Sequence, residues 1–164
     1  MNTTRRCMLM LALAMHGLPA LAAGDDDRVF TTESLRQIRA QHAGQPLVLH
    51  LWGMTCGPCL TELPRWAELR RQRPGLRLVL VQADQTPPRA SEATLRKAGL
   101  GAVERWHVVS EMDEFLRASV DPTWHGELPR TLLIAPGGEV TRVSGVADLA
   151  QVARWLDAQA VPKR

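Results

Sequence analysis

Two cysteines in the middle of the chain have the type and spacing that redox chemistry requires. Cys56 and Cys59 enclose a Gly-Pro pair, at the point where an apolar run ends and a helical pattern begins. A helix N-terminus carries unpaired backbone N–H groups and a partial positive charge, and both stabilise a thiolate. The i, i+3 spacing places both sulfurs on one side of the first turn. One cysteine can therefore form a mixed disulfide with another protein, and the second can resolve it.

Two other uses of the cysteine pair are less favoured by the sequence. The first is an inert structural disulfide, but closing so short a loop stabilises a protein little in the chain-entropy account. The second is a zinc site, which needs more ligands than one C-x-x-C supplies. The sequence contains no second C-x-x-C and no H-x₃-H motif.

The first 23 residues have the pattern of a secretory signal peptide. Two arginines precede an apolar run at 7–15, and Ala20-Leu21-Ala22 forms a small-x-small cleavage motif. The run is shorter than the ~20 apolar residues that a spanning helix needs, so we expect cleavage rather than a retained membrane anchor. Cleavage would remove Cys7 and leave a single cysteine pair in a periplasmic protein.

Composition indicates one ordinary globular domain over residues 24–164. The chain has 164 residues, of which 45% are hydrophobic and 23% are charged, and this combination excludes a disordered chain. Three cysteines are too few for a disulfide framework. Without the leader the chain carries 18 basic and 17 acidic residues, so we expect no nucleic-acid partner.

Hydrophobic periodicity predicts alternating helices and strands. Continuous apolar runs at 47–53 and 76–84 have the length of strands buried on both faces of a sheet. A strand-helix-strand unit requires a parallel pair, whereas the turn at 136–138 joins an antiparallel hairpin. Residues 110–113 have the pattern of a helix N-cap that begins at Ser110. The expected helices are 32–42, 58–73, 89–98, 114–120 and 149–160, and the expected strands are 47–53, 76–84, 106–109, 131–135 and 139–145. The predicted fold class is α/β, with a mixed central sheet and helices on both faces.

The segment 47–69, LVLHLWGMTCGPCLTELPRWAEL, resembles the active-site segment of thioredoxin-like proteins. Glu62-Leu63-Pro64 after the second cysteine, together with the leader, is similar to the TlpA/ResA branch of exported thiol–disulfide oxidoreductases. Residues 128–145 resemble the cis-proline segment and closing hairpin of that branch. The resemblance covers about residues 30–160 and implies a thioredoxin-like fold, although 84–125 carries no specific match.

The resemblance implies roles for particular residues. Cys56 matches the exposed attacking cysteine, and Cys59 matches the buried resolving cysteine. Glu62 matches a glutamate implicated in proton handling, although a first-turn glutamate also complements the helix dipole. Pro129 matches a cis-proline beside the disulfide, where the backbone of Leu128 would pair with the bound substrate chain.

Several positions depart from the pattern of the family. His50 stands where related proteins carry Asp or Asn, and it can either relay protons to the second cysteine or serve as a hydrogen-bonded core residue. Thr55 replaces the usual tryptophan before the first cysteine, which removes an aromatic rim. Arg130 follows Pro129 where a threonine is commoner; it could select an acidic partner or favour the thiolate, but by default it is expected at the surface. Trp124 can either line a substrate groove or cap the core.

We therefore expect an exported thiol–disulfide oxidoreductase that needs no cofactor. The Gly-Pro pair between the cysteines resembles that of reducing thioredoxins, so we expect a reductant of cysteine-containing exported proteins. Cytochrome c maturation and copper-site assembly are the roles that the resemblance implies. A membrane thiol electron donor would keep the protein reduced, and we expect a monomer.

Two alternative functions use the same cysteines. A copper metallochaperone would bind copper through them together with Met54, His50 or His125. A thiol peroxidase would need an isolated peroxidatic cysteine, and the adjacent Cys59 argues against it.

Overall fold

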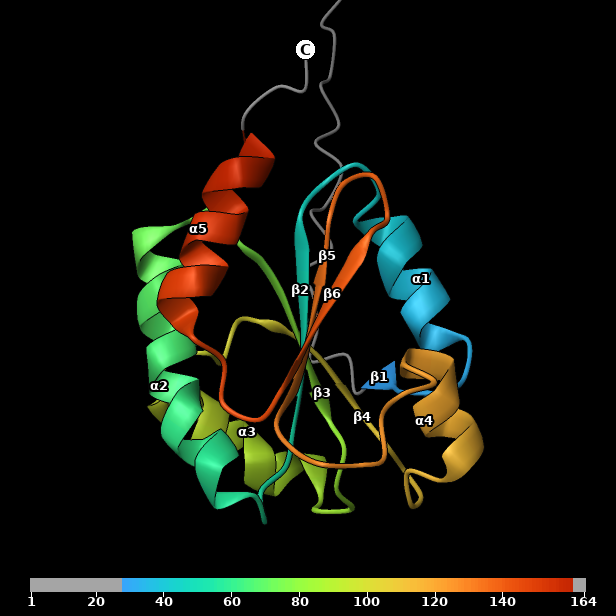
Figure 1. Cartoon of the computed structure of the whole chain (residues 1–164). Coiled ribbons are helices and arrows are strands. Elements are labelled where there is room, and N and C mark those ends of the chain that lie inside the picture. Colours follow the sequence, from blue (N-terminus) through green and yellow to red (C-terminus); the bar gives the residue numbers. More distant parts are fainter. Residues whose placement is uncertain (1–27, 161–164) are drawn as a thin grey trace, which may run out of the picture.

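A six-stranded mixed sheet forms the centre of the structure, a computed structural model that describes residues 28–160 (Figure 1). The predicted signal peptide and Cys7 lie outside the described residues. The sheet order is β1-β4-β3-β2-β5-β6. Strands β1, β4, β3 and β2 are parallel to one another, β5 is antiparallel to β2, and β6 is antiparallel to β5. The strands are β1 (Arg28–Val29), β2 (Leu47–Trp52), β3 (Arg77–Gln82), β4 (Glu104–His107), β5 (Arg130–Ile134) and β6 (Val140–Ser144). The predicted mixed sheet is thereby confirmed.

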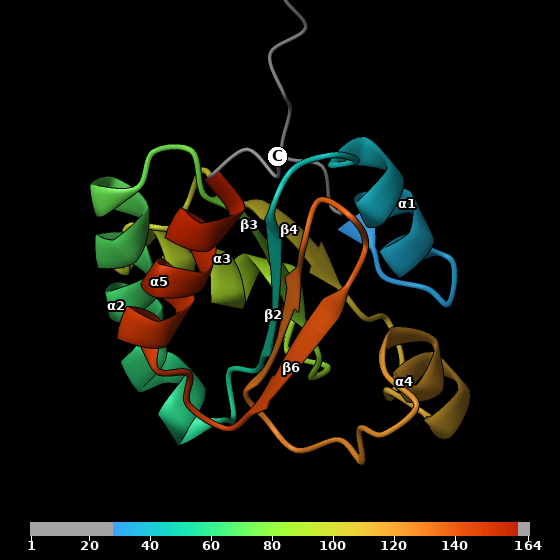
Figure 2. The ribbon, with the colours of Figure 1, turned by 45° about the horizontal axis from the view of Figure 1, so that its top comes forward.

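Helices cover both faces of this sheet, as predicted. Helices α2, α3 and α5 pack on one face around a core that includes Leu63, Leu95 and Val152. Helices α1 and α4 pack on the other face, around a core that includes Ile38 and Leu116. Figures 1 and 2 both show α5 alongside α2, with α1 and α4 on the opposite side of the sheet. The helices are α1 (Ser34–Gln41), α2 (Gly57–Gln72), α3 (Pro88–Lys97), α4 (Glu114–Val120) and α5 (Leu149–Ala160).

Three parallel strands end at the same level of the sheet. Trp52 at the end of β2 is opposite Gln82 at the end of β3, which in turn is opposite His107 at the end of β4. All six residues of β2 are buried, because both faces of this central strand are covered by helices. The loops that follow the three strands therefore meet at one edge of the sheet, and the cysteines begin α2 at that edge.

Strands β1 and β4 differ from the sequence expectations. The two-residue strand β1 was not predicted, because it is too short to show any periodicity; it pairs with Trp106 and His107 of β4. Strand β4 begins at Glu104 and ends at His107 rather than spanning 106–109.

The predicted helix cap at Ser110 is wrong. Helix α4 is capped by Asp113, whose side chain accepts a hydrogen bond from the backbone N–H of Leu116 at 2.8 Å. Asp113 is an equally good capping residue and lies directly before the helical run, which explains the shift. Among residues 28–160, no helix combines the length and apolar character needed to cross a membrane.

Candidate active site

The two cysteines form a disulfide at the N-terminus of α2. Their Cα atoms are 5.2 Å apart, and the S–S distance is 2.03 Å. Cys56 is the N-cap residue of the helix, and its Sγ accepts a hydrogen bond from the backbone N–H of Cys59 at 3.2 Å. That hydrogen bond supplies the thiolate-stabilising contact expected at a helix N-terminus.

The two sulfurs differ in their access to solvent. Cys59 is completely buried in the core, whereas Cys56 is only half-buried at the edge of it. A second disulfide can therefore reach Cys56 and not Cys59. This placement agrees with the roles that the resemblance implies for the two cysteines.

The loop before β5 lies against the loop that leads to the cysteines. The Leu128–Pro129 peptide bond is cis, as the resemblance implied, and the carbonyl of Pro129 accepts a hydrogen bond from the N–H of Gly145 at 2.9 Å. A Cβ atom added at Gly53 would lie 3.3 Å from Cδ1 of Leu128. Gly53 thus allows the close approach that brings the half-buried Leu128 next to the cysteine loop.

The expectation that Arg130 is exposed is wrong. Its side chain is buried, and it forms ion pairs with Asp121 and with Glu127. Asp121 is itself fully buried and pairs with Arg142 through Oδ1 at 3.1 Å. Ser144 completes the network by donating to Glu127 at 3.0 Å. These contacts join the end of α4, the 121–129 loop and both strands of the hairpin, and so they support the loop that carries the cis-proline.

Trp124 stands inside the same loop and points into the core. It is 4% exposed and packs in the core beneath α1 and α4, while its Nε1–H donates to the carbonyl of Glu127 at 2.7 Å. This placement favours the core-capping interpretation over a substrate groove.

Glu62 and His50 face each other beneath the disulfide site. Oε2 of Glu62 lies 3.9 Å from Nε2 of His50, and both side chains are fully buried. Neither of these two atoms has a hydrogen-bond partner, nor has the Nε1 of Trp66. Their other polar atoms are held: Oε1 of Glu62 accepts from the N–H of Ala147 at 2.8 Å, and Nδ1 of His50 lies 2.9 Å from Oγ1 of Thr131. The unpartnered atoms are thus aimed at each other in a site closed to solvent.

The protonation of this pair follows from its burial. Desolvation raises the pKa of Glu62, and the hydrogen bond from Ala147 offsets only part of that rise. Desolvation lowers the pKa of His50 to about 3, so its imidazole is neutral at physiological pH. The contact with Thr131 is compatible with either tautomer of His50, because Nδ1 can either donate to or accept from the hydroxyl of Thr131.

Asp84, which was not among the residues predicted from the sequence, contacts the residue before Cys56. Oδ2 of Asp84 accepts from the backbone N–H of Thr55 at 2.9 Å and from its hydroxyl at 3.2 Å. An acidic residue directly after a buried strand, beside the strand that leads to the cysteines, was the signal that could have found it. Thr55, noted only for the aromatic ring it lacks, is thus one half of a contact across the site.

The described residues offer no ready metal centre. Within residues 28–160, no three or more His, Cys, Asp or Glu side chains are grouped so that they could hold a metal ion. His50, one ligand suggested for the copper alternative, is buried with Nδ1 already at hydrogen-bond distance from Thr131.

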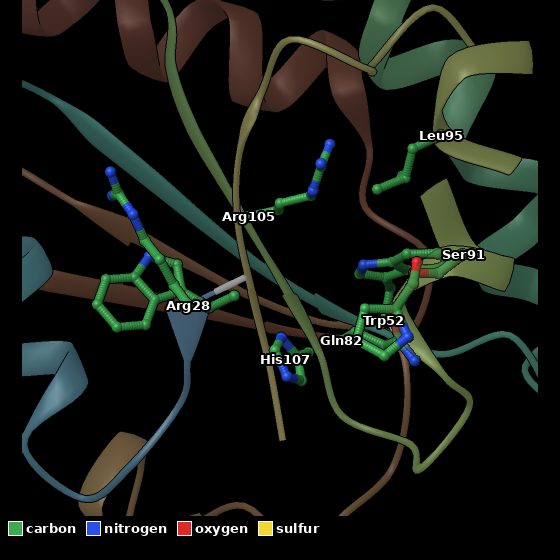
Figure 3. A pocket seen from close by; sticks show the side chains of 9 residues that line it. Arg28, Trp52, Gln82, Ser91, Leu95, Arg105 and His107 are labelled. Atoms are coloured by element: carbon green, nitrogen blue, oxygen red, sulfur yellow. The ribbon is translucent and has the colours of Figure 1, made fainter. Parts of the chain in front are cut away.

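A small cavity lies between the sheet and α3 (Figure 3). Its volume is about 20 Å³, which is enough for one water molecule. The residues that line it are Arg28, Trp52, Gln82, Pro88, Ser91, Leu95, Arg105, Trp106 and His107.

Solved structures with a similar fold include a protein described as a disulfide oxidoreductase. No family model and no curated protein matches the sequence. Among solved structures, a secreted Mycobacterium tuberculosis disulfide oxidoreductase homologous to Escherichia coli DsbE is similar, with a TM-score of 0.59 and 19% identity over 73% of this chain and 85% of its own. M. tuberculosis DsbF matches with a TM-score of 0.58 and 22% identity over 78% and 85%. StoA from Bacillus subtilis matches with a TM-score of 0.53 and 21% identity over 69% and 83%. These likenesses establish the fold, and the predicted thioredoxin-like architecture is confirmed.

Proposed function

We propose that this protein is a thiol–disulfide oxidoreductase that exchanges its Cys56–Cys59 pair with the cysteines of partner proteins. The observation that carries the proposal is the asymmetry of the disulfide, with a reachable sulfur at Cys56 and a buried one at Cys59. A structural disulfide has no need of this asymmetry, whereas sequential attack and resolution require it. The similar Mycobacterium tuberculosis structure that is named as a disulfide oxidoreductase supports the same activity.

The reaction transfers two electrons in two exchange steps. In the reduced protein, the Cys56 thiolate attacks one sulfur of a partner disulfide; an S–S bond forms to Cys56, and the partner's other sulfur leaves as a thiolate that takes up a proton. Cys59 then gives up its own proton and attacks Sγ of Cys56. The intramolecular disulfide forms, the second partner sulfur leaves as a thiolate, and the partner is reduced while this protein is oxidised.

Glu62 and His50 are proposed to handle the proton of Cys59. The buried thiol of Cys59 has no solvent to which it can lose a proton, so a protein base must accept it. Glu62 lies three residues further along α2, on the same buried side of the helix, and His50 contacts Glu62. Burial raises the pKa of Glu62 from its ordinary value toward neutrality, which favours a group that must both accept and return a proton.

The 121–129 loop is proposed to bind the partner chain. The backbone of Leu128, next to cis-Pro129, would pair with the extended segment around the partner's cysteine, while Trp124 supports the loop from inside the core. The approach of the Leu128 side chain to the cysteine loop supports this proposal, since a Cβ atom added at Gly53 would lie 3.3 Å from Cδ1 of Leu128.

The direction and setting of the reaction belong to the proposal as well. We propose a periplasmic reductant, secreted by means of a cleaved signal peptide, in a pathway such as cytochrome c maturation or copper-site assembly. Its partners would be exported proteins with cysteines, and a membrane thiol donor would return two electrons to a monomeric protein. The secreted neighbour of similar fold supports the compartment.

The decisive experiment is to trap the mixed disulfide. A Cys59→Ala variant, expressed in the native compartment, should accumulate mixed disulfides on Cys56 because the resolving thiol is missing. A Cys56→Ala variant is the matched control and should trap nothing. The purified wild-type protein should reduce insulin disulfides when it is supplied with dithiothreitol. If no partner is trapped and insulin is not reduced, the proposed activity is wrong.

A further inference from the structure

We propose that Asp84 is a positioning residue of this site, a fixed anion bonded to the residue before Cys56, whose charge makes the protein a stronger reductant. The inference rests on the proposed function and names a residue that favours electron transfer from this protein to its partner. Asp84 lies in the loop after β3, outside the segments that the exchange chemistry itself uses.

The contact fixes the cysteine loop from one side. Both donors of Thr55, the backbone N–H at 2.9 Å and the hydroxyl at 3.2 Å, are directed to the same oxygen, Oδ2 of Asp84. Two residues before Thr55, a Cβ atom added at Gly53 would come within 2.8 Å of that oxygen. The carbonyl of Gly53 in turn accepts the N–H of Cys56 at 3.3 Å. The carboxylate therefore contacts the start and the middle of the turn that presents Cys56.

The second oxygen of the carboxylate, Oδ1, is also hydrogen-bonded. Oδ1 of Asp84 accepts from the side-chain amide of Gln82 at 3.0 Å and from the N–H of Thr86 at 3.4 Å. Gln82 is the buried last residue of β3 and is 3% exposed, so its own position is set by the sheet. With both oxygens engaged, the charge cannot swing away from the cysteine loop.

The charge at Asp84 stays negative at physiological pH. Burial raises the pKa of this carboxyl, but the hydrogen bonds from Thr55, Gln82 and Thr86 outweigh that effect and bring the pKa below its usual value. All of these donors are neutral groups, so they orient the carboxylate without cancelling its charge.

A negative charge bonded to the residue before Cys56 acts on one redox state of the cysteine pair more than on the other. The disulfide is neutral, whereas the reduced site carries the Cys56 thiolate, which the Asp84 carboxylate repels. Repulsion raises the free energy of the reduced protein, so its electrons are transferred more readily to a partner disulfide. The same repulsion raises the pKa of the Cys56 thiol.

The test is Asp84→Asn, which keeps an oxygen that can accept from Thr55 and removes the charge. We expect the equilibrium constant with glutathione to shift about three- to tenfold toward the reduced protein, where tenfold corresponds to about 30 mV. The pKa of the Cys56 thiol, followed by thiolate absorbance at 240 nm, should fall. Both differences from wild type should shrink between about 0.05 and 1 M NaCl, since salt screens exposed charges.

Matched variants separate the charge from the contact. Asp157→Asn also removes one negative charge, but on α5, where Asp157 pairs with Arg73 beyond the far end of α2, and it should leave the equilibrium unchanged. Asp84→Glu keeps the charge on a longer side chain and should stay close to the wild-type equilibrium. Thr55→Val removes only the hydroxyl donor and should do the same.

Two results would overturn the inference. One is an Asp84→Asn protein that is folded and exchanges disulfides with wild-type equilibrium and thiol pKa. The other is a shift of equal size in Asp84→Asn and Asp84→Glu, which would show that geometry and not charge is at work. Both results leave the exchange activity intact, so they are distinct from failure of the proposed function, in which wild type itself would not exchange.

Discussion

Glu62 and His50 are two ionisable side chains that the fold buries in one space, and their pKa values move in opposite directions. The raised pKa of Glu62 means that the folded protein holds this proton to a higher pH than the unfolded chain does. The lowered pKa of His50 means that, between pH about 6.5 and about 3, the unfolded chain binds a proton at this residue that the folded protein does not bind. The contribution of Glu62 to the free energy of unfolding is therefore fully present below pH about 4.5 and is lost as the pH rises. Stability linked to His50 is complete above pH about 6.5 and declines as pH falls toward about 3.

Glu62→Gln should separate the stability of the protein from its activity. A neutral amide removes the cost of a buried carboxylate, so the free energy of unfolding at pH 8 should rise, and the gain should vanish below pH about 4.5. Loss of the base should slow resolution by Cys59 about 100-fold, at the low end of the range for general-base catalysis. Urea titrations across pH and stopped-flow exchange kinetics measure the two effects.

The matched control for Glu62→Gln is Glu68→Gln on the same helix. Glu68 is exposed and bonded to Arg71 and Gln72, so the substitution should change neither the exchange rate nor its pH profile. A Glu62→Gln enzyme with the wild-type rate would show that the proton of Cys59 takes another route.

Single residues also show where sequence reasoning succeeds and where it fails. The cysteine pair was predictable because its i, i+3 spacing along one helix fixes its geometry, whereas Glu62 was implied by the resemblance to the TlpA/ResA branch. The burial of Arg130 was not, since its partner Asp121 lies in a loop that shows no period and no motif match. Asp84 was missed because its contact with Thr55 spans 29 residues and depends on how two strands end side by side.

At the scale of elements, the buried ion pair between Asp121 and Arg130 ties the end of α4 to the start of β5. Asp121 also accepts from the N–H and hydroxyl of Thr123 at 3.0 and 2.8 Å and pairs with Arg142. Burial raises the pKa of Asp121, but these donors dominate and bring it to about 2. The network is therefore intact throughout the physiological range.

Asp121→Ala should leave the Arg130 guanidinium buried without its main partner and cost about 3 kcal/mol of unfolding free energy at pH 7. The difference in unfolding free energy between wild type and this variant should be fully present above pH about 4 and should disappear as the pH falls toward about 2. Chemical denaturation across pH measures both. Asp157→Ala, which breaks an exposed pair, is the control and should have little effect. An Asp121→Ala protein as stable as the control would mean that the network does not hold the loop.

At the scale of the whole molecule, the redox state and the fold are coupled through one thermodynamic cycle. Closing a four-residue loop removes only a small amount of chain entropy from the unfolded state, so the oxidised protein should be more stable than the reduced one by at most about 2 kcal/mol. A strong oxidant shows the reverse order, because its reduced form is stabilised. Thermal denaturation with and without a phosphine reductant measures which of the two forms, oxidised or reduced, is more stable. A reduced form that melts at the higher temperature would contradict the reductant assignment.

The order of the site residues along the sequence affects the behaviour of the chain before folding is complete. Cys56 and Cys59 lie in the first half of the sequence, whereas the groups that surround them, at Asp84, Leu128 and Ala147, come from later segments. A chain that emerges from its N-terminus therefore presents two reactive thiols well before it presents the surfaces that control them. During that interval the cysteines behave as ordinary thiols, able to pair with each other or with any neighbour. The site acquires its selectivity only when the final third of the polypeptide arrives.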